Sequence, residues 1–343
     1  MILTYLILVS YARFLYNRNC KILPDSVLRP NGNEISMICY DPQKGLHEMM
    51  NKKNPLRLLT ATAVLTCSLL FAFPAAAAEI RTPAADGTVT FKSGNVLVDA
   101  SHTSDGYVMV KYTGKAPRIK VRIRKDTEYT YDLNTSGNFE TFPLTEGNGD
   151  YTILVYENVG GSMYSTALSQ TFSVSLSDPN IPFLYPNQFC NFSSDSAAVG
   201  KSNELVAGST DTLQKVSNVY NFAVDNITYD YDKAATVQSG YLPVIDSTLS
   251  TKTGICFDYA ALMTAMLRAQ SIPTKLVIGY AGSTYHAWIS VYTEEQGWVD
   301  NIIRFDGNAW KYMDPTFAAS GKGNQAVSDF ITNPANYQAR FSY

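Results

Sequence analysis

The sequence predicts an α+β protein in which an all-β region precedes a domain of mixed helices and strands. Between residues 80 and 178, short segments alternate apolar and polar residues, as in 118–124, which reads R-I-K-V-R-I-R. From residue 209 onward, apolar residues recur at spacings of three and four, which is typical of amphipathic helices. Two further strand-like segments, 274–281 and 285–293, follow the helical ones.

The composition is that of a globular protein and excludes several classes of function. The chain has 343 residues, of which 45% are hydrophobic and 17% charged, and its formal net charge is -3. This balance argues against disorder and against a basic surface for nucleic acid or anionic lipid. The sequence holds no C-x-x-C, H-E-x-x-H or D-x-D-x-D motif and no phosphate-binding glycine loop, so we expect neither metal nor cofactor.

Residues 49–78 have the three-part layout of a signal peptide. Basic residues near position 52 precede an apolar run over 58–73, and four alanines over 75–78 offer an A-x-A cleavage site. A transmembrane anchor is the alternative, but the run is shorter than the roughly 20 residues that a spanning helix needs. Thr66, directly before Cys67, argues against a lipoprotein signal. We therefore expect a secreted or cell-surface protein without a membrane span after signal removal.

Residues 1–48 precede this signal, although a signal peptide normally starts the chain. We interpret them as a mis-assigned upstream extension, with translation starting at position 49 or 50. The codons for residues 44 and 45 must be purine-rich, as a ribosome-binding sequence would be.

Residues 79–178 are predicted to form an all-β sandwich, because short strands recur at regular spacing without a helical pattern. The layout resembles the immunoglobulin-like or fibronectin-like modules of secreted bacterial proteins. A basic stripe is interpreted as a solvated strand face, with an acidic polymer as the alternative ligand; it comprises Lys120, Arg122, Arg124 and Lys125. The Pro-rich stretch 179–208 is interpreted as a linker, and 209–343 as the second domain.

The second domain contains a cysteine at the start of a predicted helix. Residues 253–273 read TGICFDYAALMTAMLRAQSIP, with Thr253 as a plausible cap and Pro273 beyond the end. At this position the free backbone N–H groups and the helix dipole favour a thiolate at Cys256 and an oxyanion on an attacked acyl group. A disulfide with Cys190 is the alternative use of this thiol.

A histidine and an aspartate follow on predicted strands. Residues 285–293, YHAWISVYT, place His286 and Trp288 on one face of a hairpin strand. Residues 309–316, AWKYMDPT, place Asp314 at a strand end, where the next residue, a proline, breaks the ladder.

These residue types suit nucleophilic catalysis by a thiol. A neutral imidazole can take the thiol proton, and a carboxylate can hold the second ring nitrogen and so fix its orientation. The pattern therefore predicts Cys256 as the nucleophile, His286 as the base and Asp314 as the orienting acid. Trp288 and Tyr285 are the candidates for contact with substrate in the cleft.

The motifs T-G-I-C-F-D-Y-A-A-L, Y-H-A-W-I-S-V-Y and W-K-Y-M-D-P-T resemble those of the transglutaminase-like superfamily across residues 209–318. The resemblance implies a papain-related core, in which a helix carrying Cys256 packs on an antiparallel sheet carrying His286 and Asp314. Tyr220 and Tyr241 are candidates for an outer oxyanion donor.

The resemblance also implies an activity. We expect a secreted bacterial cysteine protease or acyltransferase that acts on peptide or protein amides, including those of a cell wall or cell surface, through an acyl-thioester. Hydrolysis is expected over amine transfer. The alternatives are protein-glutamine crosslinking and a non-catalytic binding module that retains the fold.

Overall fold

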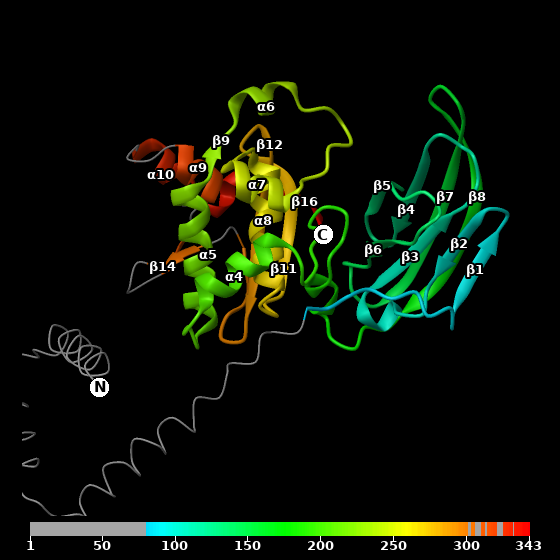
Figure 1. Ribbon diagram of the computed structural model, residues 1–343, viewed down its shortest axis with the longest axis horizontal. Coiled ribbons are helices and arrows are strands. Elements are labelled where there is room, and N and C mark those ends of the chain that lie inside the picture. The colour runs from blue at the N-terminus through cyan, green and yellow to red at the C-terminus, as the bar shows by residue number, and fades with distance from the viewer. Residues whose placement is uncertain (1–79, 301–302, 306–309, 313, 321–324, 332) are drawn as a thin grey trace, which may run out of the picture. The chain divides into compact units, whose positions relative to one another are not determined.

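The structure is a computed structural model that describes residues 80–300, 303–305, 310–312, 314–320, 325–331 and 333–343 (Figure 1). These residues belong to one compact unit, Ala75–Tyr343. The predicted upstream extension, 1–48, and the predicted signal peptide, 49–78, lie outside the described residues. No helix in the described part of the chain is long and apolar enough to cross a membrane.

The first part of the described chain is β-rich and contains two four-stranded antiparallel sheets (Figure 1). In the order β1-β2-β3-β6, one sheet comprises Thr90–Ser93, Val96–Asp99, Tyr107–Tyr112 and Glu140–Pro143. In the order β5-β4-β7-β8, the other comprises Glu128–Asp132, Ile119–Arg124, Gly149–Gly160 and Met163–Val174. A single 3-10 turn, η1 (Thr103–Asp105), leads into β3.

Alternation of buried and less buried residues, clearest along β4, β5 and β7, explains why the two sheets pack. In β4, the apolar residues at 119, 121 and 123 are buried, and the basic residues between them are not. Val121 and Val155 of one sheet share a hydrophobic core with Val108 of the other. Burying each such side chain contributes about 1.5–3 kcal/mol. The predicted β region is therefore present, and its kinship with immunoglobulin-like or fibronectin-like modules stays a prediction.

The basic stripe on β4 is largely paired with acidic neighbours. The ion pairs are Lys120 with Asp132 at 2.6 Å, Arg122 with Glu128 at 3.2 Å and Lys125 with Asp126 at 2.6 Å. These pairs support a solvated strand face, because three of the four cations already have a carboxylate partner.

The segment predicted as a linker, 179–208, is instead folded, and that prediction is wrong. It contains a 3-10 turn, η2 (Ile181–Leu184), and a helix, α4 (Ala197–Val206). Phe183 and Cys190 are buried within it. The prolines do end the β pattern. The apolar residues between them, however, pack into the protein, so the segment is not an extended linker between two parts of the chain.

The second part mixes helices and strands, as the predicted α+β class requires. Its helices are α5 (Thr212–Asn226), α6 (Tyr231–Thr236), α7 (Ile245–Thr251), α8 (Cys256–Arg268), α9 (Pro315–Ser320) and α10 (Gln325–Ile331). A four-stranded sheet has the order β13-β12-β11-β16, comprising Gly297–Val299, Thr284–Thr293, Thr274–Ala281 and Tyr337–Ser342. The neighbouring strands of this sheet are antiparallel.

Two small sheets and one turn complete this part. Strands β9 (Thr228–Tyr229) and β10 (Thr253–Gly254) are parallel, whereas β14 (Ile303–Phe305) and β15 (Trp310–Tyr312) are antiparallel; the turn is η3 (Pro334–Asn336). Asp314 follows β15, so it is not carried by the sheet that holds His286. The expectation of one sheet carrying both residues is corrected here, because β15 pairs only with β14 among the described strands.

Helix α8 packs against β11 and β12 of the four-stranded sheet (Figure 1). Leu262 and Met266 of the helix share a hydrophobic core with Ile289 and Val291 of β12, and all four are at most 3% exposed. This packing fixes the helix that begins at Cys256 relative to the strand that carries His286.

Candidate active site

Cys256 is the first residue of α8, as predicted, and its side chain is half-buried. Thr253 does not cap the helix. The backbone N–H of Ile255 instead donates to the Asp258 carboxylate, at 2.8 Å. A Cβ at position 254 would come within 2.6 Å of the Asp258 Cβ, so glycine there allows the tight approach. The first-turn N–H groups of a helix lack intrahelical acceptors, so they can face a charge that develops near the thiol.

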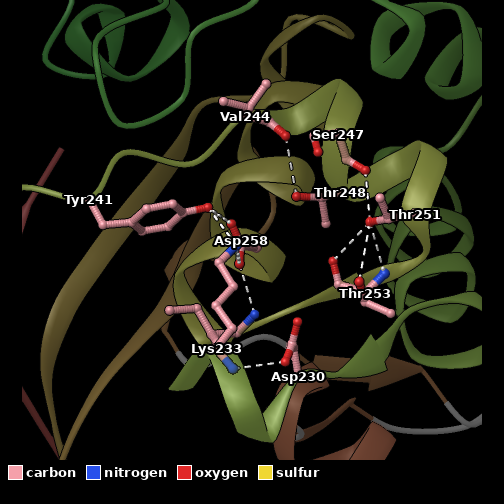
Figure 2. A network of polar contacts seen from close by, with 10 residues as sticks. Asp230, Lys233, Tyr241, Val244, Ser247, Thr248, Thr251, Thr253 and Asp258 are labelled. Carbon is pink, nitrogen blue, oxygen red and sulfur yellow. Dashed lines mark hydrogen bonds and ion pairs between the residues drawn. The ribbon is translucent and has the colours of Figure 1, made fainter. Parts of the chain in front are cut away.

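A partly buried ion pair connects the first turn of α8 to α6 (Figure 2). Asp258 is 0% exposed, and its carboxylate accepts hydrogen bonds from Lys233 Nζ at 2.7 Å and from the Tyr241 hydroxyl at 2.5 Å. Lys233 Nζ also lies 2.7 Å from the Tyr241 hydroxyl, and the Asp230 side chain caps α6 by accepting from the Lys233 backbone N–H. Burial lowers the pKa of Lys233, but its hydrogen bonds to Asp258 and Tyr241 raise it overall, so the ammonium stays charged.

His286 lies on β12, is 4% exposed and is held by Asp314. His286 Nε2 is 2.6 Å from Asp314 Oδ2. The other carboxylate oxygen, Oδ1, accepts hydrogen bonds from the backbone N–H groups of Thr316 at 2.9 Å and Phe317 at 3.1 Å, at the start of α9. Both oxygens therefore have donors, and the imidazole has a single preferred orientation.

Cys256 lies close enough to His286 to influence its charge. Burial alone would lower the pKa of His286, but the charge and hydrogen bond of Asp314, together with the hydrogen bond that the protonated ring makes to Cys256, raise it to about 10. Because Nε2 faces Asp314, Nδ1 is the ring nitrogen left for the thiol. The structure thus pairs His286 with Asp314, and Cys256 lies close enough to contribute to the raised pKa of the imidazole.

The two predicted cleft residues have different environments. Tyr285 is 60% exposed and directly precedes His286. Trp288 is only 4% exposed; its ring lies 6.2 Å from the His286 ring and packs edge-on against Tyr337 at 5.4 Å. Trp288 is therefore largely covered beside His286, and its contact with substrate stays a prediction.

Neither candidate for the outer oxyanion donor is placed for that role. Tyr220 is 1% exposed within the core, and the Tyr241 hydroxyl is occupied at Asp258. The sequence reasoning missed Tyr229, which aligns with Gly254 in the β9–β10 pair. Burial and then the nearby charge of Cys256 raise the pKa of Tyr229 to about 12. Only the short I-T-Y alternation before α6 could have indicated it.

The second cysteine serves packing. Cys190 is 0% exposed. Cys190 and Cys256 are both free cysteines, so the structure contains no disulfide between them. The buried Arg268 Nη1 lies 3.3 Å from Cys190 Sγ, and the same guanidinium donates to the carbonyls of Tyr185, Thr274 and Tyr343. Among the described residues, no cluster of three or more His, Cys, Asp or Glu could hold a metal ion.

Comparisons with known proteins point to one superfamily. Residues 200–301, which include Cys256 and His286, match the family model of the Transglutaminase-like superfamily. A protein of Methanocaldococcus jannaschii, UPF0252 protein MJ1282, is 29% identical over 252 residues, covering 62% of this chain and 66% of that protein. The protein-glutamine gamma-glutamyltransferase of Pseudomonas aeruginosa is 28% identical over 111 residues, covering 28% of this chain and 15% of that protein.

A solved structure of a candidate cysteine protease from Cytophaga hutchinsonii is also similar, with 14% identity and a TM-score of 0.35 over 69% of this chain and 83% of that one. The chain spans less than two thirds of either curated relative. The family match covers the helix of Cys256 and the hairpin of His286. The chain therefore contains a transglutaminase-like core domain.

Proposed function

We propose that this protein is a thiol enzyme that attacks amide bonds of peptides or proteins through Cys256, His286 and Asp314. The observation that carries the proposal is the 2.6 Å contact between His286 Nε2 and Asp314 Oδ2, with Cys256 close enough to raise the pKa of the same imidazole. A buried imidazole with a raised pKa beside a thiol favours a thiolate–imidazolium pair.

The chemistry follows from these positions. The Cys256 sulfur attacks the carbonyl carbon and forms a C–S bond, while the oxygen becomes an oxyanion near the first-turn N–H groups of α8. His286 gives its proton to the departing amine nitrogen as the C–N bond breaks, which leaves an acyl-thioester. Water then attacks this acyl group, His286 takes the water proton, and the C–S bond breaks to release an acid and the thiolate.

Hydrolysis is the preferred outcome, and transfer to an amine is the second candidate. Both share the acyl-thioester and differ only in the second nucleophile. The preference for water comes from the resemblance to secreted bacterial members of the superfamily. The relative in P. aeruginosa is named a protein-glutamine gamma-glutamyltransferase, which favours the second candidate. Adding a primary amine to a turnover assay separates the two, because only a transferase incorporates it into the product.

Export to the cell surface or the medium is also part of the proposal, since residues 49–78 have a signal-peptide layout. N-terminal sequencing of the purified native protein tests it. A mature chain that starts near residue 79 supports export, and a chain that retains residues 1–48 contradicts it.

The first experiment measures thiol alkylation by iodoacetamide across pH, read by mass spectrometry. We expect rapid labelling of Cys256 and slow labelling of the fully buried Cys190 in the native protein. His286→Ala should slow labelling of Cys256 by at least about 100-fold, the lower range for an acid–base group.

His102→Ala is the matched control, because His102 also binds carboxylates, Asp86 at 2.8 Å and Asp105 at 2.9 Å, but lies in the β-rich region. Labelling of Cys256 that is indifferent to His286 would contradict the enzyme proposal. The alternative of a non-catalytic binding module would then take its place.

A further inference from the structure

Exposed aromatic side chains of the described protein gather at the candidate active site. Among the described residues with assigned side-chain exposure, only three aromatic residues are classed as exposed: Tyr231 at 66%, Tyr285 at 60% and Tyr280 at 37%. Large apolar surface left in water close to a site usually marks a place where a ligand or partner is bound.

The first pair of tyrosines lies on the cysteine side of the site. Tyr229 aligns with Gly254 in the parallel β9–β10 pair, two residues before Cys256. The ring of Tyr231 meets the ring of Tyr229 edge-on, with centroids 4.9 Å apart and planes at 71°. Tyr231 opens α6, whose Lys233 is tied to the first turn of the Cys256 helix. This wall is therefore fixed relative to the thiol.

The second pair lies next to His286 along β12, with its side chains on the opposite face of the sheet. Tyr285 directly precedes His286 on β12 and is the register partner of Tyr280 on β11. Directly opposed residues of an antiparallel pair point to the same face of a sheet, and these two rings meet edge-on with centroids 5.5 Å apart. Burial raises the pKa of Tyr285 most, the neighbouring Tyr280 raises it next, and the charge of Cys256 makes a smaller contribution. The last contribution agrees with a position of Tyr285 near the thiol.

The chemistry of this rim favours an apolar partner. Each ring is braced by its neighbour, and tyrosine immobilises few rotatable bonds on binding, so it offers a large contact area at small entropic cost. Two charged groups near Cys256 are paired, Lys233 with Asp258 and His286 with Asp314, and the charge of Arg340 lowers the pKa of Tyr285 at the edge of the rim. Neither pair has a free charge to select an ionic substrate side chain.

We propose that the substrate carries an aromatic or large aliphatic side chain beside the attacked amide, and that Tyr231, Tyr280 and Tyr285 bind it. The inference rests on the function proposed above and names the class of peptide that the site accepts. Amides flanked by small or polar side chains are poor substrates on this view.

Two alkylating probes with the same reactive carbon test the inference. N-phenethyl-iodoacetamide carries an aromatic group, and N-(2-hydroxyethyl)iodoacetamide carries a small polar one. In both reactions a C–S bond forms to Cys256 and iodide leaves. The rate constants are divided by those for free cysteine, which removes intrinsic differences in reactivity. We expect the phenethyl probe to be preferred by about ten-fold or more, as burial of one aromatic group would give.

Variants show which residues cause the preference. Tyr285→Ala and Tyr231→Ala should each reduce the phenethyl preference by at least about three-fold, and Tyr285→Phe should retain it, because the ring provides the contact. Tyr164→Ala, on β8 of the β-rich region, is the matched control and should leave the preference unchanged.

The two proposals fail differently. Equal normalised rates for the two probes, or a preference that survives both alanine variants, would overturn the aromatic-substrate inference even when labelling depends on His286. Labelling that does not depend on His286 would overturn the enzyme proposal, whichever probe is preferred.

Discussion

Replacing Lys233 by Met tests whether its partly buried ion pair with Asp258 stabilises the start of the Cys256 helix. The Lys233 ammonium lies 2.7 Å from Asp258, and the two side chains are 31% and 0% exposed. Methionine keeps the length of the side chain but leaves the Asp258 carboxylate buried with only Tyr241 and the Ile255 N–H as donors. A buried charge that loses a partner raises the free energy of the folded state.

The expected cost follows from the distance and the exposure. At 2.7 Å and an effective dielectric constant of about 20, the Coulomb attraction is about 6 kcal/mol. Loss of hydration and of lysine side-chain freedom offsets most of this attraction, and water screens the exposed third of Lys233. The net loss should be that of one charged hydrogen bond, about 1.5–3 kcal/mol.

Urea unfolding followed by tryptophan fluorescence measures this loss. All three tryptophans lie between residues 288 and 310, so the signal reports on the part that holds Cys256. Lys201→Met is the matched control, because Lys201 forms an ion pair of 2.6 Å with Glu204, which is 69% exposed. An exposed pair contributes less than about 1 kcal/mol. If both variants lose the same stability, burial of Asp258 does not strengthen the Lys233 pair, and the reasoning is refuted.

Three further predictions concern the surroundings of the site. The pKa of His286 is raised from 6.5 to about 10 in the folded protein. The protonated imidazole therefore stabilises the fold fully below about pH 6.5, and this stabilisation is lost as pH rises through 10. The urea midpoint should fall over this pH range more steeply in the parent protein than in His286→Gln. Gly279→Ala should cost about 1–3 kcal/mol in the same assay, because a Cβ there would overlap the carbonyl of Gln338 and the ring of Trp288; a neutral effect would show that β16 can shift. Arg268→Met should cost at least about 3 kcal/mol, since it removes the donor to several buried carbonyls, and a smaller loss would mean that water replaces the guanidinium.

The sequence predicted the local elements around the thiol well. The apolar face after Cys256 gave the helix start, and the alternation of the next segments gave the hairpin, now β11 and β12. Each of these signals is contained within a few neighbouring residues, where helix and strand periods differ. The position of Asp314 after a short strand was also predicted, although its second role as the cap of α9 was not.

Long-range partners could not be predicted. Lys233 lies 25 residues before Asp258, and no spacing rule connects a lysine of one short helix, α6, with the third residue of a later helix. The capping signal itself was incomplete, because Ile255 replaces the serine or threonine that normally opens a capping box. The contact of Trp288 with the ring of Tyr337 could not be predicted for a similar reason, because Tyr337 comes from a distant segment.

Asp314 links the start of helix α9 to the orientation of the His286 imidazole. One carboxylate oxygen receives the N–H groups at the start of α9, and the other holds His286. At many active sites, residues needed for chemistry weaken the fold, and substitutions that strengthen it reduce activity. Here one substitution would weaken both the start of α9 and the orientation of His286. Replacement of Asp314 should therefore not produce a protein that is fully stable but inactive.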